Sequence, residues 1–273
     1  MTDVAEQYRF QRYCRARLSE PESFATAGGT VVVFSAPSPD QAERVNEDAA
    51  LLASLPGGRA VFCVADEAGG LRRGELASRM VLETLESTLS DENSPDLHGA
   101  VVRAFEQAHT RIAAEGIGAA TTLAGVMIED QRLRSFHAGD SRVLVSGQRG
   151  RRKLVTLPHS PVAYAMEAGL LNEQEALLHD KLHLVSNLVG IEGARIDVSS
   201  SIELARFDTV VIASDGLFDN FLEDEIVEHM RRGALLEVMT GLVRETHLRM
   251  LGKGTTSAGK PDDLTILLYR RQR

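Results

Sequence analysis

The short links between three apolar runs limit the possible folds of this chain more than any other sequence feature. The runs are Leu123–Ile128, Leu133–Ala138 and Val143–Ser146, and the first link centres on Asp130 and Gln131. A parallel crossover needs a dozen or more residues, so links this short join antiparallel neighbours. The sequence therefore predicts an antiparallel meander over these three runs.

Helical segments and further apolar runs surround this region. Apolar residues recur at helical spacing in 75–89, 98–114, 222–231 and 235–251, and a shorter helical segment lies near 172–179. β-branched or apolar runs typical of strands occupy 30–35, 60–65, 209–214 and 264–269. This order of elements favours mixed antiparallel sheets covered by helices over an alternating parallel fold.

The first 28 residues are polar and charged, and the pair Gly28-Gly29 follows them. We expect residues 1–28 to form an N-terminal extension in which Tyr8, Phe10 and Tyr13 pack a short helix on the body of the protein. The remaining residues, 29–273, are expected to form one domain, because a chain of this length can bury a large core.

Composition excludes several classes of protein. The formal net charge of −9 argues against a nucleic-acid binder, which usually presents a basic face. No apolar run reaches the roughly 18 residues of a membrane span, and no secretory signal is visible. The only cysteines, Cys14 and Cys63, cannot build a disulfide framework. We therefore expect a cytoplasmic protein that binds neither nucleic acid nor membrane.

Acidic residues stand at the boundaries of several predicted strands, and no lysine or arginine is embedded in those strands. One Asp-Gly after a strand is typical of a turn. Several carboxylates brought together in partly buried positions would repel one another, and a divalent cation removes that cost. Oxygen-only ligands favour magnesium, manganese or calcium. The acidic positions are Glu47, Asp48, Asp66, Glu67, Asp140, Asp215, Asp262 and Asp263.

These acidic residues lie in segments that resemble a known family. The sequence is similar, in order and from about residue 43 to residue 269, to the metal-dependent protein phosphatases of type 2C, the PPM family. The segments that carry the resemblance are NEDA (46–49), VFCVADEAGG (61–70), AATTLAGVMI (119–128), FHAGDSRVLV (136–145), VVIASDGLFD (210–219) and KPDDLTILL (260–268).

The resemblance implies a fold and a set of metal ligands. The fold is an α+β, four-layer αββα sandwich, in which two antiparallel β-sheets are flanked by helices. Asp66 would bridge two metal ions, and Asp215 and Asp262 would complete one of them. Glu47 would hold metal-bound waters, and Asp140 would serve a third ion.

The cofactor implied is Mn²⁺ or Mg²⁺, two or three ions in all. Asp66 and Asp215 would be central to catalysis, with Arg44 as a possible phosphate clamp. Residue 67 would offer its backbone carbonyl to the second metal. His137 and His159 are expected to be packing residues, since oxygen ligands suffice.

Several positions depart from the family pattern. Glu67 stands where the family has glycine, and its carboxylate would either join the second metal, strain the loop or crowd the site. The family's arginine position is Glu43 here, and Arg44 is one residue late, which in an extended segment reverses the side chain. Asp263 replaces an asparagine, and Ala68 stands where some members carry a histidine. The segment 158–190 resembles the family's flap.

Three functions remain open. The first is hydrolysis of phosphoserine and phosphothreonine in proteins by a metal-activated water, with a phosphorylated protein, a Ser/Thr kinase or its target, as partner. The second, suggested by Glu67 and Arg44, is a weakened pseudophosphatase that binds a phosphoprotein or a kinase. The third is a hydrolase of small phosphorylated metabolites.

Overall fold

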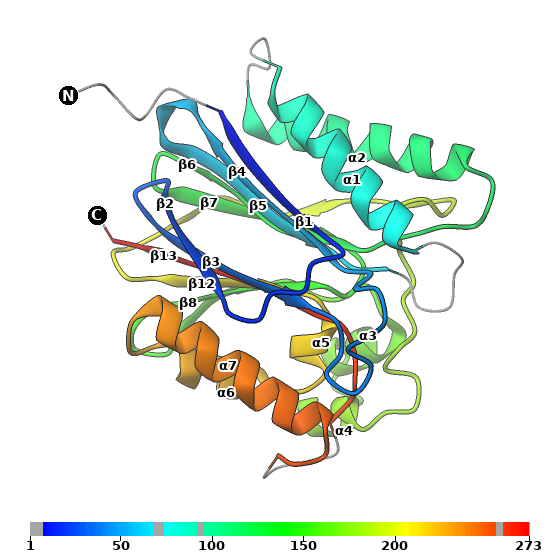
Figure 1. The fold of residues 1–273 in the computed structure, drawn as a ribbon, viewed down its shortest axis with the longest axis vertical. Helices are drawn as coiled ribbons and strands as arrows, with labels where there is room; N and C mark the ends of the chain where they lie inside the picture. The colour runs from blue at the N-terminus through cyan, green and yellow to red at the C-terminus, as the bar shows by residue number, and fades with distance from the viewer. Residues whose placement is uncertain (1–7, 68–73, 92–95, 255–258, 273) are drawn as a thin grey trace.

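Two antiparallel sheets lie face to face, and a layer of helices covers the outer face of each (Figure 1). The structure is a computed structural model that describes residues 8–67, 74–91, 96–254 and 259–272. The layer order, helices, sheet, sheet, helices, is the one that the resemblance implied. The predicted α+β, four-layer αββα fold is therefore confirmed.

The first sheet has the strand order β1-β4-β5-β6-β7-β10, with β11 also paired to β7. Its strands are β1 (Arg9–Cys14), β4 (Ala49–Leu55), β5 (Arg59–Ala65), β6 (Leu123–Glu129), β7 (Arg132–Ala138), β10 (Asp197–Val198) and β11 (Ile202–Glu203). The second sheet has the order β2-β3-β13-β12-β8-β9. Its strands are β2 (Glu22–Thr26), β3 (Gly29–Ala36), β8 (Arg142–Ser146), β9 (Arg152–Val155), β12 (Thr209–Ala213) and β13 (Leu264–Arg271).

The helices fall into three groups. The pair α1 (Gly74–Leu89) and α2 (Leu97–Ala114) covers the first sheet, while α6 (Glu223–Met230) and α7 (Leu235–Met250) cover the second. Figure 1 shows α3 (Pro161–Glu167), α4 (Glu173–Leu177) and α5 (Asp215–Phe218) gathered at one end of the molecule, away from both termini. None of the helices in the described ranges combines the length and the hydropathy that a bilayer span requires.

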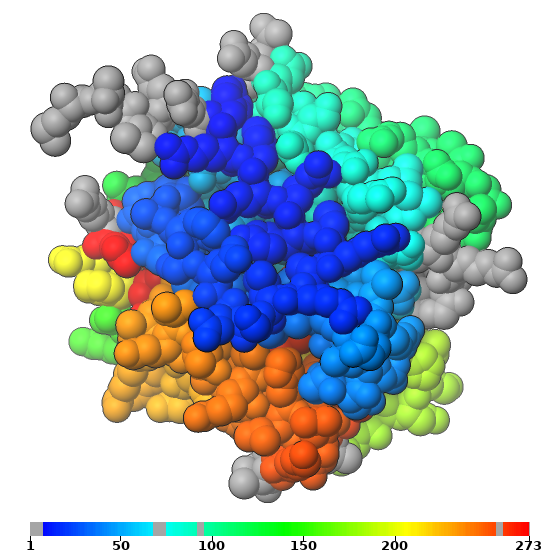
Figure 2. Space-filling view, viewed as in Figure 1, coloured from blue at the N-terminus to red at the C-terminus, as the bar shows by residue number. Residues whose placement is uncertain are grey.

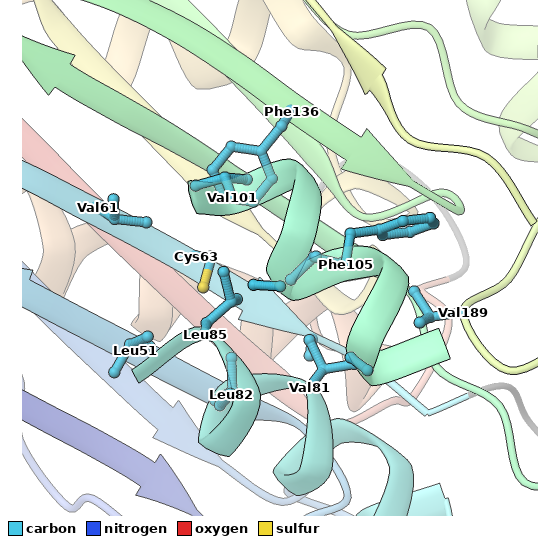
Figure 3. Close-up of a cluster of buried hydrophobic side chains, with 14 of the residues drawn as sticks. Leu51, Val61, Cys63, Val81, Leu82, Leu85, Val101, Phe105, Phe136 and Val189 are labelled. Carbon is cyan, nitrogen blue, oxygen red and sulfur yellow. The ribbon is translucent and has the colours of Figure 1, made fainter. Parts of the chain in front are cut away.

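The strands supply side chains to two cores because neighbouring residues of a strand point to opposite faces. On β4 and β5, Leu51 and Cys63 pack against the helical layer, and Figure 3 shows Leu82 and Leu85 of α1 beside them. The next residues along these strands, Leu52 and Phe62, face the other sheet and join the central core. The near-continuous apolar runs of the sequence therefore reflect strands that are buried on both faces.

The predicted meander is only half correct. β6 and β7 form a hairpin whose link residues Asp130 and Gln131 both have positive φ, 49° and 63°. β8 does not pair with β7; it pairs with β12 and β9 in the second sheet. A three-residue link, 139–141, joins β7 to β8 and is long enough for a corner between facing sheets. Short links exclude a parallel crossover, but they do not distinguish a hairpin from such a corner.

The helix expected near Tyr8, Phe10 and Tyr13 is wrong, because these residues lie in or beside a strand. β1 pairs with β4, and β2 pairs with β3, so the described part of this segment, residues 8–28, supplies an edge strand to each sheet. In Figure 2 this segment, in blue, spreads over the face between α1 in cyan and α7 in orange. Charged residues suit an exposed edge, which explains why the segment is polar.

Removal of residues 1–28 should destabilise the protein strongly. A truncated chain beginning at Gly29 would uncover side chains of the central core and leave β3 and β4 as unpaired edges. Loss of burial costs about 1.5–3 kcal/mol for each large side chain. We expect the free energy of unfolding to fall by about 3 kcal/mol or more in urea titrations. A chain beginning at Tyr8 is the control and should match the full chain; equal stability of all three would show that 1–28 is a dispensable extension.

Candidate active site

The acidic residues singled out in the sequence come together at the end of the sandwich where α5 lies. Asp66 directly follows β5, and Asp140 occupies the corner between β7 and β8. Asp215 begins α5 just after β12, and Asp262 precedes β13. Since β12 and β13 are antiparallel, with Ala213 opposite Ile266, the end of one lies beside the beginning of the other. Strand pairing therefore brings together carboxylates that are far apart in the chain.

Two glycines permit the close approach of these segments. A Cβ at Gly216 would lie 2.0 Å from the carbonyl oxygen of Asp263. A Cβ at Gly139, where φ is +105°, would lie 2.7 Å from Cβ of Thr122. Glycine is therefore required beside Asp215 and beside Asp140, because any side chain would push the loops that carry these carboxylates apart.

Hydroxyl groups fix the backbone of Asp66. Its N–H donates to Oγ1 of Thr122 at 3.0 Å, and its carbonyl accepts from Oγ1 of Thr121 at 2.6 Å and from the backbone N–H of Thr122 at 2.8 Å. Oγ1 of Thr122 also lies 2.7 Å from Oγ of Ser141. The paired-threonine segment and the Gly-Asp-Ser-Arg segment thus act together to position Asp66.

Asp48 is a member of the cluster that we did not assign from the sequence. Its side chain is buried and accepts a hydrogen bond of 2.8 Å from Oγ of Ser214. Asp48 also interacts with the carboxyl of Asp66, which lowers the pKa of Asp48, although burial and repulsion from Asp263 raise it overall. The signal was present in the sequence, since Asp48 adjoins Glu47 in the first acidic segment.

Burial and mutual repulsion raise the pKa values of these carboxyls. Burial is the larger cause for Asp66, whose pKa lies well above its ordinary value, followed by repulsion from Asp48, Asp215, Asp262 and Asp140. The same two causes, with burial first, raise the pKa to about 7 for Asp48 and Asp140 and to about 8 for Asp262. These carboxyl groups resist ionisation when no cation is present. Such a set of oxygen donors is one that a hard divalent cation would stabilise in its ionised form.

Glu67 also belongs to this cluster. Burial, followed by repulsion from Glu47, Asp48 and Asp263, raises its pKa to about 7. Its φ is not positive, so the backbone at this position does not need glycine. Of the outcomes expected for Glu67, a strained left-handed loop is therefore excluded, and its carboxyl lies among the other acids. Its neighbour Ala68 falls outside the described residues.

Arg44 lies at the rim of the site. Its side chain is two-thirds exposed, at 66%, and its Nη2 is 3.8 Å from Oε2 of Glu47. Nη1 donates to Gln41 at 2.8 Å. Arg17 supports this loop by donating to the backbone carbonyls of residues 42–44. Arg44 is therefore exposed at the rim, where Gln41 and Glu47 are its side-chain partners.

The replacement of asparagine by Asp263 has a structural explanation. Its Oδ2 accepts the backbone N–H of Glu47 at 2.7 Å, and its Oδ1 accepts that of Ser38 at 3.1 Å. A carboxylate can accept at both oxygens, whereas an amide offers only one acceptor atom. Asp263 thus ties the last acidic segment to the first and fixes the position of Glu47.

Lys260 supplies positive charge that the strands do not provide. Its Nζ donates to Oδ2 of Asp215 and Oδ2 of Asp219, both at 2.8 Å, and lies 3.5 Å from Oδ2 of Asp262. Asp219 is buried, and burial and repulsion from Asp215 raise its pKa to about 6. We assigned neither Lys260 nor Asp219 from the sequence, because the lysine reaches the cluster from a loop.

A second group of potential metal ligands is His137, His159 and Asp197, and the hydrogen bonds of His159 oppose metal binding there. Nδ1 of His159 accepts from the backbone N–H of Gly139 at 3.2 Å and from the amide of Asn187 at 2.7 Å. Nε2 of His159 therefore carries the proton and faces Asp197 at 3.3 Å. A neutral imidazole then has no lone pair left for a metal. The two histidine rings stack at 4.5 Å, as expected for packing residues.

This fold, with an all-oxygen acidic cluster at one end of a double sheet, defines the class of metal-dependent phosphatases. Residues 37–250 match the family model described as protein phosphatase 2C, which covers most of the chain. The chain therefore belongs to the protein phosphatase 2C family, and the resemblance to PPM phosphatases is confirmed.

Two relatives and one solved structure illustrate this membership. The serine/threonine protein phosphatase PstP of Mycobacterium tuberculosis is 28% identical over 232 residues, which are 82% of this chain and 41% of PstP. The serine/threonine phosphatase stp of Listeria monocytogenes is 24% identical, covering 77% of this chain and 84% of stp. The crystal structure of the PstP catalytic domain in complex with 2 manganese ions superposes with a TM-score of 0.70 at 24% identity, over 89% of this chain and 98% of that one. The chain spans about two fifths of the length of PstP.

The metal-free protein should lose stability as the pH rises. A raised pKa means that the folded chain still holds protons that the unfolded chain releases near its ordinary Asp value of about 3.9. The stability that Asp48, Asp140 and Asp262 contribute is therefore fully present below that value. It is lost as the pH rises through their folded-state pKa values, about 7–8. We expect the midpoint temperature of thermal unfolding, measured in EDTA, to decrease as the pH is raised from about 5 to about 8.

Addition of Mn²⁺ should reverse this loss at the high-pH end. At a concentration 100 times its Kd, a ligand stabilises by about 2.7 kcal/mol, which corresponds to roughly 5–10 °C in a chain of this size. Scanning fluorimetry over a pH series, with and without Mn²⁺, measures both effects. A midpoint in EDTA that is flat or rises with pH would contradict the electrostatic account of the cluster.

Proposed function

We propose that this chain hydrolyses phosphoserine and phosphothreonine in proteins, in a reaction that depends on Mn²⁺ or Mg²⁺. The observation that carries the proposal is the convergence of Asp66, at the end of β5, on Asp215 and Asp262, whose segments are brought together by the β12–β13 pairing. Membership of the protein phosphatase 2C family supports the reaction class. The metal-bound PstP structure, a protein with the same fold, supports the choice of cofactor.

The donor set fits divalent cations. Asp66, Asp215 and Asp262 would hold the first ion, with Asp66 shared by a second, and Asp140 adjoins them. Glu47 would bind through water. Bound dications would polarise the phosphoryl group and lower the pKa of an attacking water. Without a cation, burial and repulsion raise the pKa values of Asp48 and Asp66 and favour their protonated forms.

The chain's own side chains would position this chemistry. Thr121 and Thr122 hold Asp66 in place, and Ser214 directs Asp48 toward it. Oγ of Ser214 accepts the backbone N–H of Thr265 at 3.2 Å, which links this serine to β13. Arg44, exposed at the rim, is placed to meet the phosphate of an incoming substrate, because a guanidinium suits phosphate geometry. Catalysis of this kind depends on positioning and charge stabilisation.

Substitution of Asp215 by asparagine tests the assignment. Asp215→Asn should lower the hydrolysis of a phosphothreonine peptide in Mn²⁺ by at least about 100-fold, the scale expected for a principal electrostatic contributor. Asp224→Asn is the matched control, because its side chain is 81% exposed and lies on α6. Phosphate release is the measurement. Retention of activity in Asp215→Asn, with the protein folded, would refute the proposed site.

A pseudophosphatase that binds a phosphoprotein or a kinase is the second candidate. The observation that favours it is the carboxyl of Glu67 within the acidic cluster, where additional negative charge can alter how metal and phosphate bind. If the first proposal holds, wild-type protein hydrolyses the phosphopeptide and Glu67→Gly changes the rate by less than about tenfold.

The contrary result has a clear signature. Calorimetric binding of Mn²⁺ to the wild-type protein without hydrolysis, followed by recovery of hydrolysis in Glu67→Gly, would favour the pseudophosphatase. Glu67→Gln separates the effect of charge from that of backbone freedom.

Assay of free phosphoserine beside the peptide distinguishes a protein phosphatase from a metabolite hydrolase. A phosphorylated Ser/Thr kinase, or its target, is the protein substrate that we propose.

A further inference from the structure

We propose that Lys260 is a built-in cation that takes the place of one divalent ion at the Asp215–Asp219 side of the site. This inference rests on the proposed metal-dependent function. It adds that the chain binds fewer ions, or binds them more weakly, than its carboxylates would hold without the lysine. Lys260 would then set the metal requirement of this protein.

The ammonium group contacts the carboxylates as a metal ion would. Nζ lies 2.8 Å from Oδ2 of both Asp215 and Asp219, and 3.5 Å from Oδ2 of Asp262. An ammonium has three donors and no acceptor, so three carboxylates can satisfy it. Asp215 and Asp262 are two of the proposed ligands of the first ion. The lysine and a metal ion therefore compete for the same oxygens.

The backbone of Lys260 is held in place for this contact. Its N–H donates to Oδ1 of Asn220, and its carbonyl accepts from Nδ2 of Asn220, both at 2.9 Å. The same Nδ2 donates to the carbonyl of Gly216 at 2.9 Å. The side chain of Asn220 is buried. One amide therefore joins the backbone of Lys260 to the turn that carries Asp215, and the lysine is more than a mobile surface residue.

A further layer supports Asn220. Nη1 of the buried Arg249 donates to the carbonyl of Asn220 at 2.7 Å, and both Nη atoms bind the Glu225 carboxylate at 2.9 Å. The loop approaches Arg249 so closely that a Cβ at Gly259 would lie 2.0 Å from the Arg249 carbonyl oxygen. Helices α6 and α7 thus fix the loop that delivers Lys260 to the carboxylates.

The position of Lys260 indicates which ion it replaces. Asp140, the residue expected to serve a third ion, is repelled by Asp215 and Asp219 and attracted by Lys260. The lysine therefore neutralises the side of the cluster on which Asp140 and Asp219 lie. An ion held by Asp66 would also lie near Asp48, whose negative charge Lys260 does not contact. Like charges at short distance repel, so a dication at Asp140 is disfavoured while Lys260 is in place.

Calorimetric titration with MnCl₂ tests this role. Lys260→Met removes the charge but leaves both backbone bonds to Asn220. We expect it to bind one more Mn²⁺ than the wild-type protein, or to bind the same number at least about tenfold more tightly. Lys260→Arg keeps the charge and should match the wild type. Lys253→Met is the matched control, because Lys253 is exposed in the loop after α7.

Lys260→Gln provides a second neutral variant if Lys260→Met does not fold without metal, which thermal unfolding in EDTA reveals. Unchanged stoichiometry and affinity in a folded neutral variant would overturn the role of Lys260. If wild-type protein still hydrolyses the phosphopeptide in that case, the proposed function stands. Increased Mn²⁺ binding in the neutral variants without hydrolysis by the wild type would support Lys260 and refute the proposed function. Failure of every variant to bind Mn²⁺ would overturn both.

Discussion

Repulsion among buried carboxylates is the constraint on which the site depends. Burial raises the pKa values of Asp48, Asp66 and Asp262, and repulsion from neighbouring carboxylates raises them further. A fold does not gain stability from such a cluster by itself. The surrounding hydroxyls, backbone N–H groups and Lys260 hold it together, and a divalent cation would complete it. The arrangement thus favours ion binding over the stability of the empty chain.

The double sheet makes this concentration of charge possible. Each acidic residue lies outside the regular hydrogen-bonding ladder, at a strand end or a corner, while the strand behind it is fixed on both faces. The corner at Asp140 exists because β7 and β8 belong to different sheets, so that this loop crosses the end of the sandwich. Close contacts at Gly139 and Gly216 then set the spacing between loops. Rigid strands therefore determine the geometry of flexible polar segments.

Three residues set the charge and the hydrogen bonding around the acidic cluster. Asp263 accepts two backbone N–H groups, Glu67 adds a carboxyl, and Lys260 brings a positive charge. The sequence showed the first two as departures from a pattern, but the physical role of Asp263 became clear only from its two hydrogen bonds. Lys260 was indistinguishable from an ordinary loop lysine until its contacts were known.

The sequence by itself determined the family, the antiparallel double sheet, most helices and the carboxylates that gather at one end, because apolar periodicity and acidic residues at strand ends are local signals. Only the tertiary structure decided that residues 9–26 are edge strands, since their polar composition resembles that of a loop. It also decided that β8 leaves the first sheet, and that Asp48, Asp219 and Lys260 join the cluster. These facts depend on contacts between distant segments, and spacing along the chain carries no record of such contacts.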